Sequence, residues 1–439
     1  MEFGSKKSIF IILLTAVLVT SVFFTSHNES PLSTKKIEIT SSIQDAVSTP
    51  SSEEPSLPVL PPQPPTKLEN PPEIIKAVYV TGWSAGSKPY LNYLLNLFET
   101  TEINAVVIDI KDYSGKVSYK TDASEVKKYN LYNYAISDID SLVRFFHNKN
   151  IYVIGRISVF EDPAYARARP ELAIYDVKKT FSSKLAINPK TGVLTQNDLK
   201  PILWEDNNKL SWLDPASVEV WDYNISLAKD IFYHGFDEVN FDYIRFPSDG
   251  ETKNMGFPVW NRKTPLAQII KEFFGYLRKE LDGDVISVDL FGQTTVDRAD
   301  MGIGQILEDA LENFDYISPM LYPSHYANGF IGFKNPAEYP YEVVKYSMDS
   351  ALLRKRIYLN KIKESILGEE PWEMKIPSPI EIKLAEFRPW LQDFNMGANY
   401  TAEMVQQEIK AMQDSLGSDY RGYMLWNPSN IYTIGAVQK

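Results

Sequence analysis

The sequence predicts an α/β fold, a (β/α)8 TIM barrel, from three observations. Short apolar runs alternate with amphipathic helical patterns from residue 77 to about 430 of the 439-residue chain. The run 236–247 puts Glu238, Asn240 and Asp242 on one face of a strand and apolar residues on the other. A glycine-rich phosphate loop after a strand is typical of an open, doubly wound sheet, and no such loop follows any predicted strand here. A buried strand with one polar face fits a barrel with a polar lumen, whose chemistry lies at the C-terminal ends of the strands.

The predicted elements follow one another in βα order. We expect strands at 77–83, 105–110, 151–158, 236–247, 285–291, 315–322, 382–391 and 420–426. We expect helices over Tyr90 to Phe98, at about 137–148, from Pro215 onward, and at 264–281, 303–313, 340–356 and 401–415. Asp214 is the expected N-cap of the helix that begins at Pro215. Gly283 is expected to end the helix at 264–281. The chain ends soon after the eighth strand, so the last helix should be incomplete.

Residues 161–213 separate the third predicted strand from the next helix. The segment is too long for a simple βα loop, and turn signals divide it at 188–189, 191–192 and 206–208. We predict a subdomain-like insertion that lies over the barrel mouth.

The first 73 residues differ from the remainder of the chain. Lys6 and Lys7 precede the apolar run 9–24, which is the pattern of a signal peptide or signal anchor in residues 1–25. Residues 26–73 contain ten of the 28 prolines and form a Pro/Ser-rich linker. We therefore expect an extracytoplasmic barrel at 74–439, either secreted or held to the membrane by its uncleaved N-terminal helix.

The composition narrows the partners and the chemistry. A formal net charge of −12 argues against nucleic acid as a partner, because phosphate backbones call for basic patches. The sequence has no cysteine, which excludes disulfides, thiol catalysis and thiolate metal sites. Its four histidines are widely separated and form no metal-binding motif. We expect no metal and no cofactor.

Carboxylates gather at the ends of the predicted strands, and two of them are the candidate catalytic pair. They are Asp109, Asp112, Glu161, Asp162, Asp242, Asp289 and Asp393. Glycoside hydrolysis needs one ionised and one protonated carboxyl on either side of a bond. We predict Asp242 as nucleophile and Asp289 as acid/base, with Glu161 as a competing acid. The structural alternatives are a buried Asp242 bonded to the barrel backbone and an exposed loop carboxylate at Glu161.

Six segments, in order along the chain, resemble one known family. They are 77–83, 107–112, 212–215, 236–247, 318–326 and 388–394. The chain is similar to the glycoside hydrolase-like barrel family, a family of unknown function related to the α-amylase-like TIM barrels. The resemblance implies retaining hydrolysis of a cell-wall polysaccharide or exopolysaccharide. Related barrels often place the acid/base on strand five, usually as Glu, where this chain has Asp289.

Other side chains near the strand ends are candidates for substrate binding. Asp109 and Lys111 form either an ion pair at a sugar subsite or a pair that fills the lumen. Arg156 and Arg245 favour ionised carboxylates at the mouth, and Arg388 and Gln392 resemble positioning residues. Aromatic platforms for sugars are expected at strand ends: Trp83, Tyr243, Tyr322, His325, Trp390 and Trp426. Two rival hypotheses remain open, a non-catalytic carbohydrate-binding barrel and a structural envelope barrel.

Overall fold

The structure, a computed structural model, describes residues 63–184, 201–367 and 382–439. The predicted signal segment 1–25 and the linker up to residue 62 lie outside the described residues, as do parts of the predicted insertion and residues 368–381. Within the described ranges, no helix has both the length and the apolar character needed to cross a membrane.

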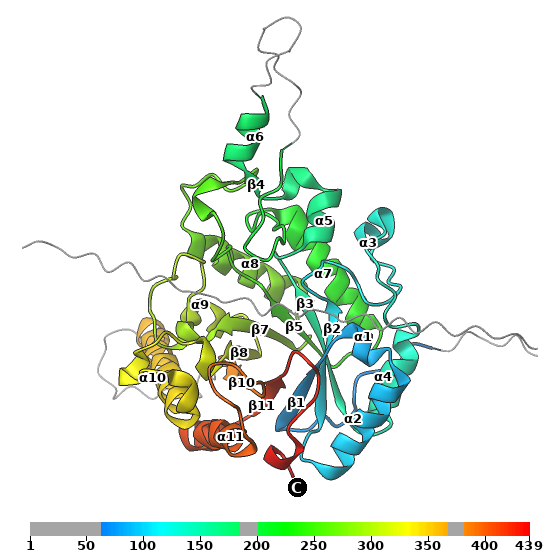
Figure 1. Cartoon of the computed structure of the whole chain (residues 1–439), viewed down its shortest axis with the longest axis vertical. Coiled ribbons are helices and arrows are strands. Elements are labelled where there is room, and N and C mark those ends of the chain that lie inside the picture. The colour runs from blue at the N-terminus through cyan, green and yellow to red at the C-terminus, as the bar shows by residue number, and fades with distance from the viewer. Residues whose placement is uncertain (1–62, 185–200, 368–381) are drawn as a thin grey trace, which may run out of the picture. The chain divides into compact units, whose positions relative to one another are not determined.

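A closed parallel sheet lies at the centre of the protein, with helices around it (Figure 1). The eight positions of the barrel are filled by β1 (Ile75–Val80), β2 (Ala105–Lys111), β3 (Tyr152–Ser158), β5 (Glu238–Asp242), β7 (Ile286–Phe291), β8 (Tyr316–Met320), the pair β9 (Glu386–Phe387) and β10 (Trp390–Gln392), and β11 (Gly422–Trp426). The ring closes because β11 pairs with β1 and β10 pairs with β8. The predicted (β/α)8 barrel is confirmed.

Helices connect successive strands and cover the outside of the barrel. They are α2 (Lys88–Thr100), α4 (Ile139–His147), α7 (Val218–Tyr233), α8 (Leu266–Glu280), α9 (Leu307–Leu311), α10 (Pro340–Leu367) and α11 (Ala402–Leu416). After β11, the described chain forms only the short 3-10 turn η8 (Ile434–Ala436). The incomplete last helix was therefore predicted correctly.

Successive side chains along each strand point alternately outward and inward, and this alternation produces two separate apolar layers, one outside the barrel and one in its lumen. Val239 and Phe241 pack in the layer between the barrel and its helices. A second, smaller apolar cluster fills the lumen and includes Ala77, Val107 and Met424. Glu238, Asn240 and Asp242 point into the lumen, as the alternation along β5 predicts.

A β-bulge near the end of β2 separates Asp109 from Lys111, so the prediction that these two residues form a pair at a subsite or in the lumen is wrong. Asp109 pairs with Arg156, but Lys111 pairs with Ile157 because the register shifts between them. The Lys111 ammonium group therefore points outward, where it is fully buried and contacts Asp162 and Asn224 at 2.8 Å each. Lys111 does not line the lumen.

Two other differences from the sequence analysis have local causes. The seventh strand is split because Pro389, which has no backbone N–H, separates β9 from β10. The helix that we expected to start at Pro215 begins at Val218, with Ser217 as N-cap. The Asp214 carboxylate instead accepts from the backbone N–H groups of Val259 and Trp260 at 2.8 and 2.9 Å.

The described part of the insertion packs against the loop after β5. It contains the short elements α5 (Pro163–Ala168), η1 (Pro170–Leu172), β4 (Tyr175–Asp176) and α6 (Val177–Lys184). β4 pairs with β6 (Met255–Gly256), and Glu161 forms an isolated antiparallel bridge with Trp212. Figure 1 shows α5, β4 and α6 together beside α7 and α8.

The chain enters the barrel at its floor, the end where the strands begin. Lys67 forms an ion pair with Asp284 at 2.7 Å, and the Leu68 N–H donates to Asp237 at 2.7 Å. Asp237 directly precedes β5, and Leu68 packs against the apolar cluster of the lumen. Lys67 and Leu68 are thus in contact with the barrel, although both lie in the segment 26–73 that we predicted to be a linker.

Candidate active site

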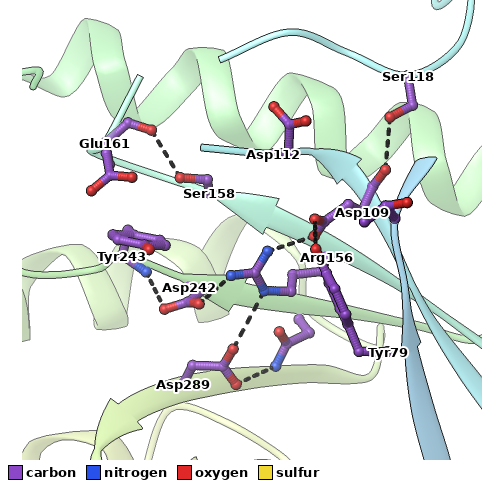
Figure 2. A network of polar contacts seen from close by, with 12 residues as sticks. Tyr79, Asp109, Asp112, Ser118, Arg156, Ser158, Glu161, Asp242, Tyr243 and Asp289 are labelled. Carbon is purple, nitrogen blue, oxygen red and sulfur yellow. Dashed lines mark hydrogen bonds and ion pairs between the residues drawn. The ribbon is translucent and has the colours of Figure 1, made fainter. Parts of the chain in front are cut away.

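Arg156 lies at the centre of the barrel mouth, between three carboxylates from three other strands (Figure 2). Its Nη1 is 2.5 Å from Oδ1 of Asp109, and its Nη2 is 2.5 Å from Oδ2 of Asp242. Its Nε is 3.8 Å from Oδ2 of Asp289. One guanidinium therefore faces three acids, an excess of negative charge that opposes the simultaneous ionisation of all three.

Asp242 is held by donors on both oxygens. Besides the Arg156 contact, its Oδ1 accepts a hydrogen bond of 2.5 Å from the backbone N–H of Tyr243. Tyr243 has a φ of +55°, a left-handed conformation that is uncommon for an aromatic residue. Such backbone strain clusters at functional sites, and here it occurs at the residue whose amide donates to Asp242. Both oxygens of the Asp242 carboxylate are therefore fixed in position by donors from β3 and from the backbone.

Asp289 lies opposite Asp242 on the neighbouring strand, as the pairing of Phe241 with Val288 requires. Its Oδ1 accepts from Asn240 Nδ2 and from Trp390 Nε1, each at 2.8 Å. Burial raises the pKa of Asp289 well above its usual range, and the charge of Asp242 adds to this. The environment therefore pushes this carboxyl toward its neutral form, while its neighbour Asp242 is held by two donors.

Asp109 completes the group around Arg156. The Tyr79 hydroxyl on β1 donates to Asp109 Oδ2, and burial raises the pKa of Asp109 although Arg156 opposes the change. Sequence reasoning missed Tyr79 and Asn240 as parts of the site. The signal for Tyr79 was its parity with Ala77 on β1, since both side chains face the lumen.

Glu161 follows β3 and lies at the edge of the same mouth. The residue is only 3% exposed, so the alternative of an exposed loop carboxylate is wrong. Arg245 is close by, and its guanidinium stacks on the rings of Trp212 and Phe291 at 4.7 and 4.8 Å. Figure 2 shows the Glu161 carboxyl pointing toward the Tyr243 ring. Glu161 and Arg245 thus join the group that the sequence analysis assembled.

The predicted aromatic platforms fall into three environments. Trp83, on α1 (Gly82–Ala85), is 61% exposed and open to a ligand. Tyr322 and Trp426 stack on one another, with ring centroids 5.5 Å apart, and His325 packs edge-on against Tyr322. Trp390 is buried, with its indole N–H committed to Asp289. Trp390 therefore supports the carboxylate and does not offer a stacking surface.

Two predicted positioning residues differ in their location. Gln392 is fully buried near the mouth, where its Oε1 accepts from the Ser324 hydroxyl at 2.8 Å. Arg388 is at the opposite end: it donates to Glu238 and stacks on Tyr316, the first residues of β5 and β8. Arg388 does not reach the mouth, because it lies two residues before Trp390 and its side chain points to the floor.

Among the described residues, no cluster of three or more His, Asp or Glu side chains has the arrangement of a metal site.

Solved structures with a related fold include one protein of moderate sequence identity. A hypothetical protein from Ruminiclostridium thermocellum ATCC 27405 is 36% identical, with a TM-score of 0.41, over 48% of this chain and 96% of that one. The glycoside hydrolase domain of PgaB (BpsB) from Bordetella bronchiseptica is 12% identical, with a TM-score of 0.49, over 81% of this chain and 95% of that one. The α-L-fucosidase isoenzyme 2 of Paenibacillus thiaminolyticus is 12% identical, with a TM-score of 0.46, over 83% and 48%.

No curated protein matches the chain. A family model does match, over residues 77–432, which is nearly the whole barrel. The description of that family is "Putative glycosyl hydrolase domain". The match covers the strands and loops that carry Tyr79, Arg156, Asp242 and Asp289. The chain therefore belongs to this glycosyl hydrolase family.

Proposed function

We propose that the protein is an extracytoplasmic glycoside hydrolase that cleaves a cell-wall polysaccharide or exopolysaccharide with retention of configuration. The observation that carries the proposal is the pairing of Asp242 with Arg156 beside carboxyls that favour the neutral form. Glycosidases need this difference between two acids, one charged and one protonated. Family membership supports the reaction class.

In the proposed reaction, Asp242 attacks the anomeric carbon while a neutral carboxyl protonates the departing oxygen. A covalent glycosyl-enzyme forms, and water then releases the sugar as the same carboxyl takes back a proton. Asp289 and Glu161 are the two candidates for the proton donor. Both feel the negative charge of Asp242. A retaining enzyme holds its two carboxyls about 5–5.5 Å apart, so that one of them can attack the anomeric carbon directly.

The polymeric substrate and the location outside the cytoplasm rest on different features. Trp83 offers an exposed indole next to the mouth, a surface on which the apolar face of a sugar can pack. The basic and apolar start of the sequence and the Pro/Ser-rich segment after it support export and a spacer.

A product screen on residues 63–439 tests the proposal. Cell-wall polysaccharides and exopolysaccharides are incubated with the wild-type protein and with Asp242→Asn, and released oligosaccharides are detected by mass. We expect products from the wild type alone, and proton NMR of the first-formed product should show the anomeric configuration of the substrate. Binding of a glycan by both proteins without any product would instead favour a non-catalytic carbohydrate-binding barrel. An inverted product would overturn only the retaining course.

A further inference from the structure

The backbone at Glu161 is fixed from both sides. The Ser158 hydroxyl donates to the Glu161 carbonyl at 2.8 Å, and the Leu213 N–H donates to the carbonyl of Phe160 at 2.9 Å. The antiparallel bridge to Trp212 joins this turn to the insertion. These contacts hold the backbone of the turn that carries Glu161, which a functional side chain on a loop requires.

The buried Lys111 secures the next residue along the chain. Its Nζ is 2.8 Å from Asp162 Oδ2, while Asp162 Oδ1 accepts from the Tyr165 N–H at 2.8 Å and caps α5. Neither Lys111 nor Asp162 is exposed. The outward turn of Lys111 at the β2 bulge thus places a buried ion pair directly behind Glu161.

The Glu161 carboxyl itself lacks a hydrogen-bond donor among the residues that the structure describes. The other buried acids near it each accept at least one hydrogen bond: Asp109 from Tyr79, Asp242 from the Tyr243 amide, and Oδ1 of Asp289 from Asn240 and Trp390, although Oδ2 of Asp289 has no hydrogen-bond partner. Buried carboxyls are nearly always hydrogen-bonded, and an exception calls for an explanation. A carboxyl that points into an active-site mouth without a partner is available to a substrate.

The surroundings of Glu161 also favour its protonated form. Burial raises the pKa of Glu161 well above its usual range; the Arg245 charge opposes the rise, and Asp206, Asp242 and Asp249 add to it. Arg245 makes its own hydrogen bonds to the Phe246 carbonyl and the Ser248 hydroxyl, both at 3.3 Å. The nearest guanidinium is therefore engaged elsewhere.

We propose that Glu161, and not Asp289, is the proton donor to the departing glycosidic oxygen. This inference rests on the proposed function. As Asp242 forms a bond to the anomeric carbon and the bond to the leaving oxygen breaks, the Glu161 proton passes to that oxygen. In the second step the Glu161 carboxylate accepts a proton from water, whose oxygen replaces Asp242 on the anomeric carbon.

Asp289 is less suited to that exchange. Its Oδ1 accepts two hydrogen bonds, from Asn240 and Trp390, and its buried Oδ2, which has no hydrogen-bond partner, lies 3.8 Å from the positively charged Arg156 Nε. The residue is 1% exposed and lies on the strand wall. Asp289 is a positioning residue for Arg156 and Asp242 in this assignment.

The test compares leaving groups. Wild type, Glu161→Gln and Asp289→Asn are assayed on 2,4-dinitrophenyl and phenyl glycosides of glucose, galactose, N-acetylglucosamine and fucose. A dinitrophenolate leaves without a proton, whereas phenol needs one, and general acids contribute about 10²–10⁴-fold. We expect Glu161→Gln to lower kcat/KM by at least ~100-fold on the phenyl glycoside and by less than ~10-fold on the dinitrophenyl glycoside. Asp289→Asn should lower both by a similar factor.

Two further variants complete the design. Asp112→Asn is the matched control, since the Asp112 carboxylate lies at the same mouth and accepts from Ser114 of its own loop; it should keep the wild-type ratio between the two leaving groups. Azide should rescue Glu161→Ala on the dinitrophenyl substrate and yield a glycosyl azide of retained configuration. The assignment is overturned if Asp289→Asn shows the leaving-group dependence and Glu161→Gln does not. Failure of the wild type on every glycoside and glycan overturns the proposed function instead.

Discussion

The Nη2 of Arg156 lies 2.5 Å from Oδ2 of Asp242, and Nη1 of the same guanidinium lies 2.5 Å from Oδ1 of Asp109. Arg156 thus joins β2, β3 and β5 across the mouth, because two separate nitrogens of its planar guanidinium reach carboxylates on different strands. Arg156 is therefore the positive charge around which the three carboxylates of the candidate site are arranged.

Arg156→Lys should lower kcat/KM by about 10²–10³-fold, the usual cost of removing one preorganised donor from an active site. The charge remains, but a lysine carries all of its donors on one nitrogen, whereas Arg156 reaches Asp109 and Asp242 through two separate nitrogens. Steady-state kinetics on a confirmed substrate measure the effect. Arg421→Lys is a suitable control, because Arg421 lies at the floor, where it donates to nearby backbone carbonyls and pairs with Glu386 at 3.8 Å. Equal activity of Arg156→Lys and the wild type would show that the fork geometry is dispensable.

Asp242→Asn should reduce kcat by about 10³-fold or more and leave glycan binding largely intact. The amide keeps the size of the side chain but cannot attack the anomeric carbon. Calorimetric titration with a product oligosaccharide compares the affinities of the variant and the wild type. Turnover near the wild-type rate would move the nucleophile to another carboxylate of the mouth, with Asp109 next in line.

Glu161→Gln should stabilise the protein, and more so as the pH rises. Folding raises the pKa of Glu161, so its neutral form stabilises the fold fully below the unfolded pKa of about 4.3, and this stabilisation is lost as the pH rises through the folded pKa. Glutamine stays neutral throughout. At high pH, the free energy of unfolding of Glu161→Gln should exceed that of the wild type by ~1.4 kcal/mol for each unit by which folding raises the pKa of Glu161. Melting temperatures at pH 4 and pH 8 measure it, with Asp112→Asn as the control; a difference that does not grow with pH would contradict the buried, unpaired carboxyl.

Removal of residues 63–73 should lower the melting temperature, whereas removal of residues 1–62 should not. Leu68 covers the apolar floor of the lumen, and Lys67 pairs with Asp284. Partial burial of a leucine and one backbone hydrogen bond contribute roughly 1–3 kcal/mol together. Calorimetry on proteins that begin at residue 63 or 74 tests this, and Leu68→Ala should reproduce part of the loss. Identical melting of the two truncated proteins would show that the strap formed by 63–73 adds nothing.

Side-chain parity explains most of what the sequence predicted about the site. The alternation on β5 and β7 placed Asp242 and Asp289 on the lumen side, because a strand has a period of two and its first residue fixes all the others. Parity failed at Lys111, where a bulge changed the face of a residue without any glycine to signal it.

Other features depend on tertiary contacts that no local pattern records. The direction of the Arg388 side chain is decided by Glu238, which is 150 positions away in the sequence. The two donors to Asp289 come from β5 and β10, so neither could be identified before the strand order was known. The contact of residues 63–73 with the floor was missed because proline-rich composition predicts extended chain but not what that chain lies against.

Both ends of the described body lie at the floor, and this determines how the protein can be mounted. The chain arrives beneath β5 and β7 through Lys67 and Leu68, and the Lys439 ammonium group ends on the carbonyls of Phe98 and Glu99, where α2 returns to the strand starts. A protein coupled to a support through either end presents its mouth to the medium. Long polymers can then approach Arg156 and Asp242 from the open side.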